Sequence, residues 1–183
     1  MSLFPLGLLS QGGGAGGGGA FEQIATTFGT GSSSTLTFSS IPATYKHLQI
    51  RVSANNATGF SGLSVRFNGD TAANYSRHFL NGDGSTVTSF GASSQDRSLV
   101  GIAGSGTTNI FPATIMDILD YSTTTKNKTI RSLTGYAQSG ANLVYLYSGG
   151  WYSTAAINSI TLFDNSSNNF NTSSRFTLYG IKG

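Results

Sequence analysis

The sequence predicts an all-β protein, an antiparallel β-sandwich of jelly-roll type with an extended Gly-rich N-terminal arm. Leu48, Ile50 and Val52 alternate with polar residues, which is the period of a half-buried strand. The 183 residues include 12 Phe, 8 Tyr and 25 Gly but only 3 Pro, a composition typical of strands joined by tight turns. Turn signals such as Asn-Gly-Asp at 68–70 separate the apolar segments. No segment shows a convincing helical period.

About ten strands are expected between residues 21 and 181, a density typical of a sandwich. The first are expected at 21–28, 35–38, 45–54, 63–67, 75–80, 87–90 and 98–103. Apolar arms on both sides of a polar tip predict a β-hairpin over 114–131. Two aromatic strands at 143–147 and 151–152 are then separated by Ser-Gly-Gly, followed by strands at 157–163 and 176–181.

The composition indicates one domain over residues 21–183 and a separate arm over residues 1–20. The absence of Cys excludes disulfides, thiolate metal sites and cysteine nucleophiles, and no cofactor is expected. Apolar runs stay well short of the roughly 18 residues of a membrane span, so no membrane insertion is expected. The net charge of +3 comes from scattered bases without a basic patch, so nucleic acid is not an expected partner.

The arm combines an apolar peptide with a tract of glycines. Such a tract has no side chains to bury and the highest entropy cost of ordering. We expect the apolar peptide to anchor the chain in another protein, with the glycines as a spacer; the alternative is an arm that folds back on its own domain. The expected anchoring residues are Leu3, Phe4, Pro5, Leu6, Leu8 and Leu9.

Five charges are concentrated in the predicted hairpin, in a chain that is only 9% charged. The acids lie on the outbound arm and the bases on the return, so opposite signs can face each other and help to fix the register. The expected ion-pairing residues are Asp117, Asp120, Lys126, Lys128 and Arg131. Because residues three apart on a strand point to opposite faces, the two acids are a poor match for a glycosidase pair. Neither His47 nor His78 lies in a recognisable catalytic pattern, and no catalytic residue is assigned.

An aromatic segment comprises Tyr145, Tyr147, Trp151 and Tyr152 and has two interpretations. Exposed rings of this kind can stack on sugars, which predicts a glycan site. Alternation instead places Tyr145 and Tyr147 on one face, which favours a core or a subunit interface.

Six segments are spread in order over nearly the whole chain: the arm PLGLL, FSSIPATYKHLQIRV (38–52), FNGDTAANYSRHFLNGDGS (67–85), DILDYSTTTKNKTIRSLTGY (117–136), WYSTAAINSIT (151–161) and FTLYGIKG (176–183). Together they resemble a family of small virion structural proteins encoded by tailed bacteriophages and prophages. The resemblance implies a non-enzymatic component with a jelly-roll-like domain attached to the virion, and it brings no catalytic residues.

We therefore expect a virion structural protein, made in the bacterial host cytoplasm and placed on the particle exterior. The favoured placement is a tail-fibre or baseplate appendage that contributes to host attachment. It would assemble as a homo-oligomer, expected to be a trimer, contact other virion proteins through its arm and present a loop face to host glycans. The alternatives are a capsid decoration (cement) or head-fibre protein, and, in another class, a carbohydrate-binding module. A hydrolase is disfavoured because the chain has only seven acidic residues, mostly in turns.

Overall fold

The computed structural model describes residues 19–56, 58–138 and 141–183, and these residues form twelve strands and no helix. The strands are β1 (Phe21–Phe28), β2 (Thr35–Phe38), β3 (His47–Ser53), β4 (Phe60–Phe67), β5 (Tyr75–Gly82), β6 (Val87–Gln95), β7 (Ser98–Ser105), β8 (Ala113–Leu119), β9 (Lys128–Gln138), β10 (Ala141–Trp151), β11 (Ile160–Asp164) and β12 (Arg175–Ile181).

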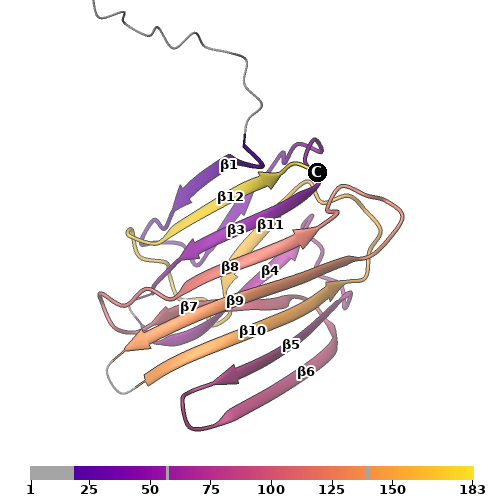
Figure 1. Ribbon diagram of the computed structural model, residues 1–183. Helices are drawn as coiled ribbons and strands as arrows, with labels where there is room; N and C mark the ends of the chain where they lie inside the picture. The colour runs from indigo at the N-terminus through magenta and orange to yellow at the C-terminus, as the bar shows by residue number, and fades with distance from the viewer. Residues whose placement is uncertain (1–18, 57, 139–140) are drawn as a thin grey trace, which may run out of the picture.

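The strands form two sheets that face each other (Figure 1). The large sheet has eight strands in the order β1-β12-β3-β8-β9-β10-β5-β6, and the small sheet has four in the order β2-β11-β4-β7. Early and late strands pair in nested order, β3 with β12, β4 with β11 and β5 with β10, as when one long hairpin wraps into two layers. All pairs are antiparallel, so the predicted antiparallel sandwich is confirmed.

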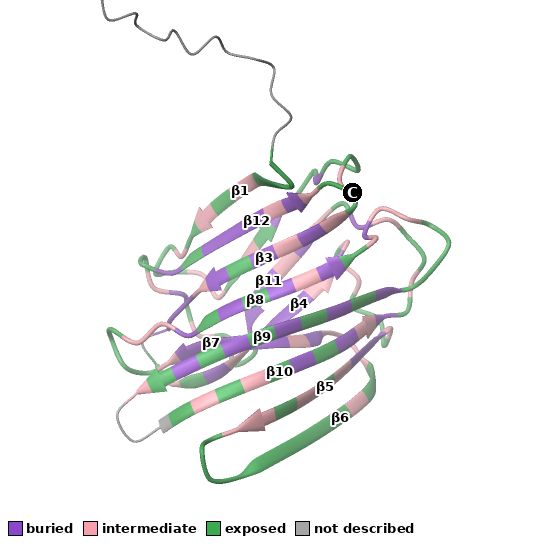
Figure 2. Ribbon diagram, viewed as in Figure 1, coloured by how far each residue is buried: buried purple, intermediate pink, exposed green. Residues whose placement is uncertain are grey.

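The hydrophobic core lies between the sheets and is supplied by alternation along the strands (Figure 2). Leu48 and Ile50 of β3 and Leu63 and Val65 of β4 are all fully buried in it. Burying an aliphatic side chain of this size stabilises the fold by about 1.5–3 kcal/mol. On β9, buried and exposed residues alternate over almost the whole strand, so its outward face consists of every second residue.

The large sheet extends past the small one at one end. The edge strand β7 of the small sheet packs against β9, β10 and β5. β6 lies one strand further out, and seven of its nine residues are exposed (Figure 2). This end of the large sheet therefore has solvent on both faces.

The segment 148–150 differs from the sequence-based expectation, because it belongs to the single strand β10 and does not separate two strands. A Cβ at Gly149 would lie 2.1 Å from Ser98 Oγ and 2.8 Å from the carbonyl oxygen of Ser76. Glycine is needed here because β7 of the facing sheet and β5 of the same sheet approach the β10 backbone so closely that a side chain would collide with them. The hairpin's return strand also runs further than expected, to Gln138, and the strands number twelve where the sequence indicated about ten.

Candidate functional site

The outward face of the large sheet carries a row of apolar side chains that runs across four neighbouring strands. Ile115 of β8 lies opposite Leu133 of β9, Leu133 opposite Leu146 of β10, and Leu146 opposite Leu80 of β5. Their exposed fractions are 45%, 53%, 52% and 48%. We call this row the leucine ridge. Contiguous exposed apolar patches larger than a few hundred Å² are rare on monomeric proteins, and the largest such patch of a protein is often an interaction site.

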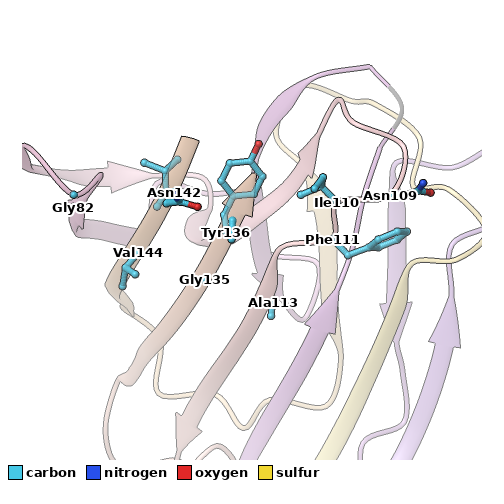
Figure 3. A pocket seen from close by; sticks show the side chains of 12 residues that line it. Gly82, Asn109, Ile110, Phe111, Ala113, Gly135, Tyr136, Asn142 and Val144 are labelled. Carbon is cyan, nitrogen blue, oxygen red and sulfur yellow. The ribbon is translucent and has the colours of Figure 1, made fainter. Parts of the chain in front are cut away.

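A second row, made of three small residues and one valine, runs parallel to the ridge, two residues further along each strand. Ala113, Gly135, Val144 and Gly82 lie opposite one another in the same four strands, and we call this row the groove. A Cβ at Gly135 would meet no atom within 4 Å. These four residues line one side of a hollow of about 690 Å³, whose other walls come from the ends of the neighbouring strands and from the loop before β8, including Asn109, Ile110 and Phe111 (Figure 3).

Polar and charged groups border the ridge on its other side. Arg131 Nε donates to Asp117 Oδ2 at 3.1 Å, and Gln49 Nε2 donates to Asp117 Oδ1 at 2.9 Å. Gln49 Oε1 in turn accepts a hydrogen bond from Arg51 Nε at 2.9 Å. These groups form a polar ladder across β3, β8 and β9, so the ridge is apolar and its border is ionic.

The other charges of the hairpin lie at its tip. Asp120 follows the end of β8 with a positive φ of 49° and forms an ion pair with Lys126. A second base, Lys46, lies 3.2 Å from Asp120 Oδ1. The ion pairs to Lys126 and Lys46 hold the pKa of Asp120 at about 2. Both acids of the hairpin thus pair with bases and stabilise the loop and the register.

Lys128 takes no part in these ion pairs. Its side chain is 1% exposed, and Nζ donates to the carbonyl oxygens of Thr123, Lys126 and Thr154 at 2.8, 3.0 and 3.3 Å. Burial lowers the pKa of its ammonium group, and the charge of Lys126 lowers it further. Lys128 therefore ties the hairpin tip to the loop that follows β10.

The four aromatics of the predicted glycan or interface site do not share one surface. Trp151 is only 2% exposed, and its Nε1 donates to Asp70 Oδ2 at 2.7 Å. Tyr152 is 53% exposed, just beyond the end of β10. Tyr145 and Tyr147 stack on each other with ring centroids 5.3 Å apart. Trp151 belongs to the core and is not accessible to a sugar.

Two aromatics not anticipated from the sequence join Tyr145 on the inward face of the overhanging end. The ring of Phe79 lies 5.6 Å from both Tyr145 and Phe90, and the Arg77 guanidinium lies 5.7 Å from the Phe90 centroid. Phe90 is 45% exposed, because β7 does not reach this far. The sequence could have placed Phe79 and Arg77 on one face, because residues two apart on β5 point to the same side. It could not have predicted their contact with Phe90, because that contact depends on the pairing of β5 with β6.

The carboxylates are all engaged by the fold. Each of the seven acidic residues has a polar partner: Glu22 with Lys182, Asp70 with Trp151, Asp83 with the backbone of Ser85 and Thr86, Asp96 with Arg66 and Arg97, Asp117 with Arg131, Asp120 with Lys126, and Asp164 with Asn56 and Ser61. His47 Nδ1 accepts a hydrogen bond from the backbone amide of Asp120 at 3.0 Å.

Within the described ranges, no three or more of His, Asp and Glu gather in a way that would hold a metal ion. None of the residues that the structure describes forms a helix long and apolar enough to cross a membrane. The expected anchoring residues of the arm, Leu3, Phe4, Pro5, Leu6, Leu8 and Leu9, lie outside the described residues.

Comparison of the chain with protein-family models, with curated proteins and with solved structures found no match. The fold itself defines the class of protein as an antiparallel β-sandwich with sheets of eight and four strands and a row of apolar side chains on the outward face of the larger sheet.

Proposed function

We propose that this chain is a non-enzymatic structural protein of a bacteriophage virion, in which the sandwich is displayed on the particle exterior and assembles with other protein subunits. The observation that carries the proposal is the leucine ridge, because four apolar side chains aligned across a sheet are costly to leave in water. The resemblance of six segments to phage virion proteins gives the proposal its direction.

The engagement of the carboxylates supports a structural role over a hydrolytic one. Glycoside hydrolysis needs two carboxyl groups facing a substrate, one of which is protonated at neutral pH. Here Asp96 and Asp120 have pKa values of about 2, held down chiefly by hydrogen bonds from Arg97 and Lys126 respectively. Groups held ionised by such partners suit the stabilisation of loops.

The placement that we favour is a tail-fibre or baseplate appendage, anchored by residues 1–20 and contributing to host attachment. A specific observation favours the attachment role: Phe79, Phe90 and Tyr145 form a partly exposed aromatic cluster beside Arg77. Aromatic faces of this kind bind the apolar faces of sugar rings. Capsid decoration, the alternative placement, requires no such cluster.

The placement is tested on purified particles of the phage that encodes the chain. We expect the full chain to be present at low copy number and to be lost from particles when residues 1–20 are deleted. High copy number would indicate capsid decoration instead. Particles that lack the chain altogether, or that retain the deletion variant at the normal level, would contradict the virion role or the anchoring role respectively.

The attachment role is tested separately on a glycan array with the full chain. We expect binding that is lost in Phe90→Ala, because Phe90 is the most accessible ring of the cluster. Tyr152→Ala is the matched control, since Tyr152 is an aromatic outside the cluster and is slightly more exposed than Phe90. Binding that survives Phe90→Ala but not Tyr152→Ala would place the site elsewhere. Tight binding by a chain that is absent from particles would favour a carbohydrate-binding module.

A further inference from the structure

We infer that the outward face of the large sheet binds a second copy of this chain, face to face, about a twofold axis that runs across the strands. The inference deepens the proposed function, on which it rests for the assumption that the sandwich assembles with other protein subunits. The two faces would be held together by the leucine ridge of each copy lying in the groove of the other.

The ridge and the groove are reciprocal in shape. They are parallel rows on the same strands, two residues apart, which is about 7 Å along a strand. Consider a twofold axis that lies between the two facing sheets, parallel to the rows and midway between them. Rotation about this axis brings the ridge of one copy to the position of the other copy's groove. It therefore places the ridge of one copy over the groove of its partner, twice per dimer, and keeps the strands of the two copies nearly aligned.

The residues brought together by this axis are complementary in size. Leu133 of one copy faces Gly135 of the other, and Leu80 faces Gly82. An added Cβ meets nothing within 4 Å at Gly135 and only the Thr86 carbonyl oxygen, at 3.9 Å, at Gly82. Both glycines thus leave room for an incoming leucine side chain.

The remaining pairs fit in the same way. Ile115 would face Ala113 of the partner copy, a small residue, and Leu146 would face Val144, an apolar one, which is 57% exposed. In three of the four pairs a large side chain faces a small one, which is how packed sheets interdigitate.

The charge pattern favours a copy of this chain over a partner of opposite charge. From β8 to β6 the ridge row continues to Ser89 and the groove row to Val87, and neither row contains a charged side chain over these strands. The charged Arg51 of β3 lies opposite Ile115 and ends the ridge row on its other side. Arg131 and Asp117, on the border, already neutralise each other. A neutral apolar face is complemented by another neutral apolar face. A second copy of this chain carries such a face and is present at the same concentration.

The face is also large enough. Five strands about 4.8 Å apart, with about eight residues each at about 3.4 Å per residue, cover roughly 650 Å². Standard stable interfaces bury about 600–1,000 Å² on each partner, so this face falls at the lower end of that range. This contact joins two copies, whereas the resemblance led us to expect a trimer. The number of chains per assembly in solution decides between a dimer and a trimer.

The test is the mass of the full chain in solution, measured by analytical ultracentrifugation over a range of concentrations. We expect twice the 19.0 kDa of one chain. Gly135→Leu should weaken association by about ten-fold or more, because the new side chain occupies the space of the incoming Leu133. The glycine has no positive φ and no near neighbour, so the folded monomer accommodates the leucine.

A swap of the two residues makes the test specific. In Leu133→Gly/Gly135→Leu the ridge and groove exchange places on β9, and the same axis again sets leucine against glycine. We expect the double variant to recover most of the association lost in Gly135→Leu. Phe28→Glu is the control for a general surface effect, because Phe28 is 56% exposed at the opposite edge of the sheet, and it should leave the mass unchanged. Thermal unfolding of each variant checks the fold.

A wild-type mass of one chain or of three would overturn the inference, and so would unaltered association of Gly135→Leu. A swap variant that stays dissociated although folded would also overturn it. Incorporation into particles is measured on the same variants. A chain that enters particles but does not dimerise contradicts only this inference, and a dimer that is absent from particles contradicts only the virion role.

Discussion

Arg131 of β9 lies directly opposite Asp117 of β8, and its Nε donates to Asp117 Oδ2 at 3.1 Å. The side chain of Arg131 is 72% exposed, so water and salt screen the interaction. We expect a double-mutant cycle with Asp117→Asn and Arg131→Met to give a coupling energy of about 0.2–0.5 kcal/mol in low salt. The measurement is urea unfolding at low and high ionic strength, and at about 1 M salt, where the Debye length is about 3 Å, the coupling should nearly vanish.

The Gln49–Asp117 hydrogen bond provides the control for this cycle. It joins a neutral donor to the same carboxylate, at 2.9 Å, and does not depend on an ion pair. A cycle of Gln49→Ala with Asp117→Ala should therefore give a coupling energy that depends little on salt. A coupling energy between Asp117 and Arg131 well above about 1 kcal/mol, or one that salt does not reduce, would mean that the pair is buried in an assembly and not exposed.

Lys128 should contribute far more to the free energy of unfolding than the nearby Lys126. In Lys128→Met the carbonyl oxygens of Thr123 and Thr154 lose their donor in a site that is closed to water, and we expect a loss of about 2–3 kcal/mol in the free energy of unfolding. Lys126→Met is the matched control, because the Lys126 side chain is 58% exposed. It should cost about 0.5 kcal/mol or less. Equal effects in chemical denaturation would show that Lys128 has no structural role.

A strand could be predicted from the sequence where apolar and polar residues alternate within the strand itself. β3 and β9 alternate buried and exposed residues, and the period of two was visible in the sequence at Leu48, Ile50 and Val52. The strand break expected at 148–150 was wrong, because the close approach of Ser98 to Gly149 joins β7 to β10, about fifty residues apart, and leaves no local signal.

The ridge and groove could not be predicted for a related reason. Leu133 and Leu146 belong to neighbouring strands, but Leu80 and Ile115 join them only through the strand order β8-β9-β10-β5. That order is set by long-range pairing, and a shift of one residue in any pair would turn the side chains to the other face. The ionic hairpin was predictable because its two strands are adjacent in the chain, whereas the burial of Lys128 depends on the loop after β10.

Trp151 offers a test of the core that needs no assembly. Since it is the single tryptophan and is 2% exposed, we expect short-wavelength fluorescence, weak quenching by acrylamide and no response to soluble sugars. Trp151→Phe removes the Nε1 hydrogen bond to the Asp70 carboxylate and should cost about 1.5–3 kcal/mol. Tyr152→Phe, at the exposed neighbouring position, should leave stability unchanged. Fluorescence typical of an exposed indole would contradict the position of Trp151 in the core.

Acid should destabilise the fold through Asp96 and Asp120. Hydrogen bonds from Arg97 and Arg66 lower the pKa of Asp96, and those from Lys126 and Lys46 lower that of Asp120, in both cases from an ordinary value of 3.8 to about 2. A carboxyl group whose pKa is lower in the folded state binds fewer protons there than in the unfolded state. Its stabilising effect is therefore complete above pH 4 or so and is lost as the pH falls through about 2.

The measurement is the thermal midpoint of the wild type and of Asp96→Asn/Asp120→Asn between pH 7 and pH 2. The double variant should melt lower than the wild type at pH 7 and lose less on acidification, so that the two curves converge near pH 2. The effect is modest, because the Asp96 side chain is 39% exposed and water screens its two arginines. Parallel curves for the two proteins would show that other carboxylates, such as the buried Asp164, govern acid unfolding.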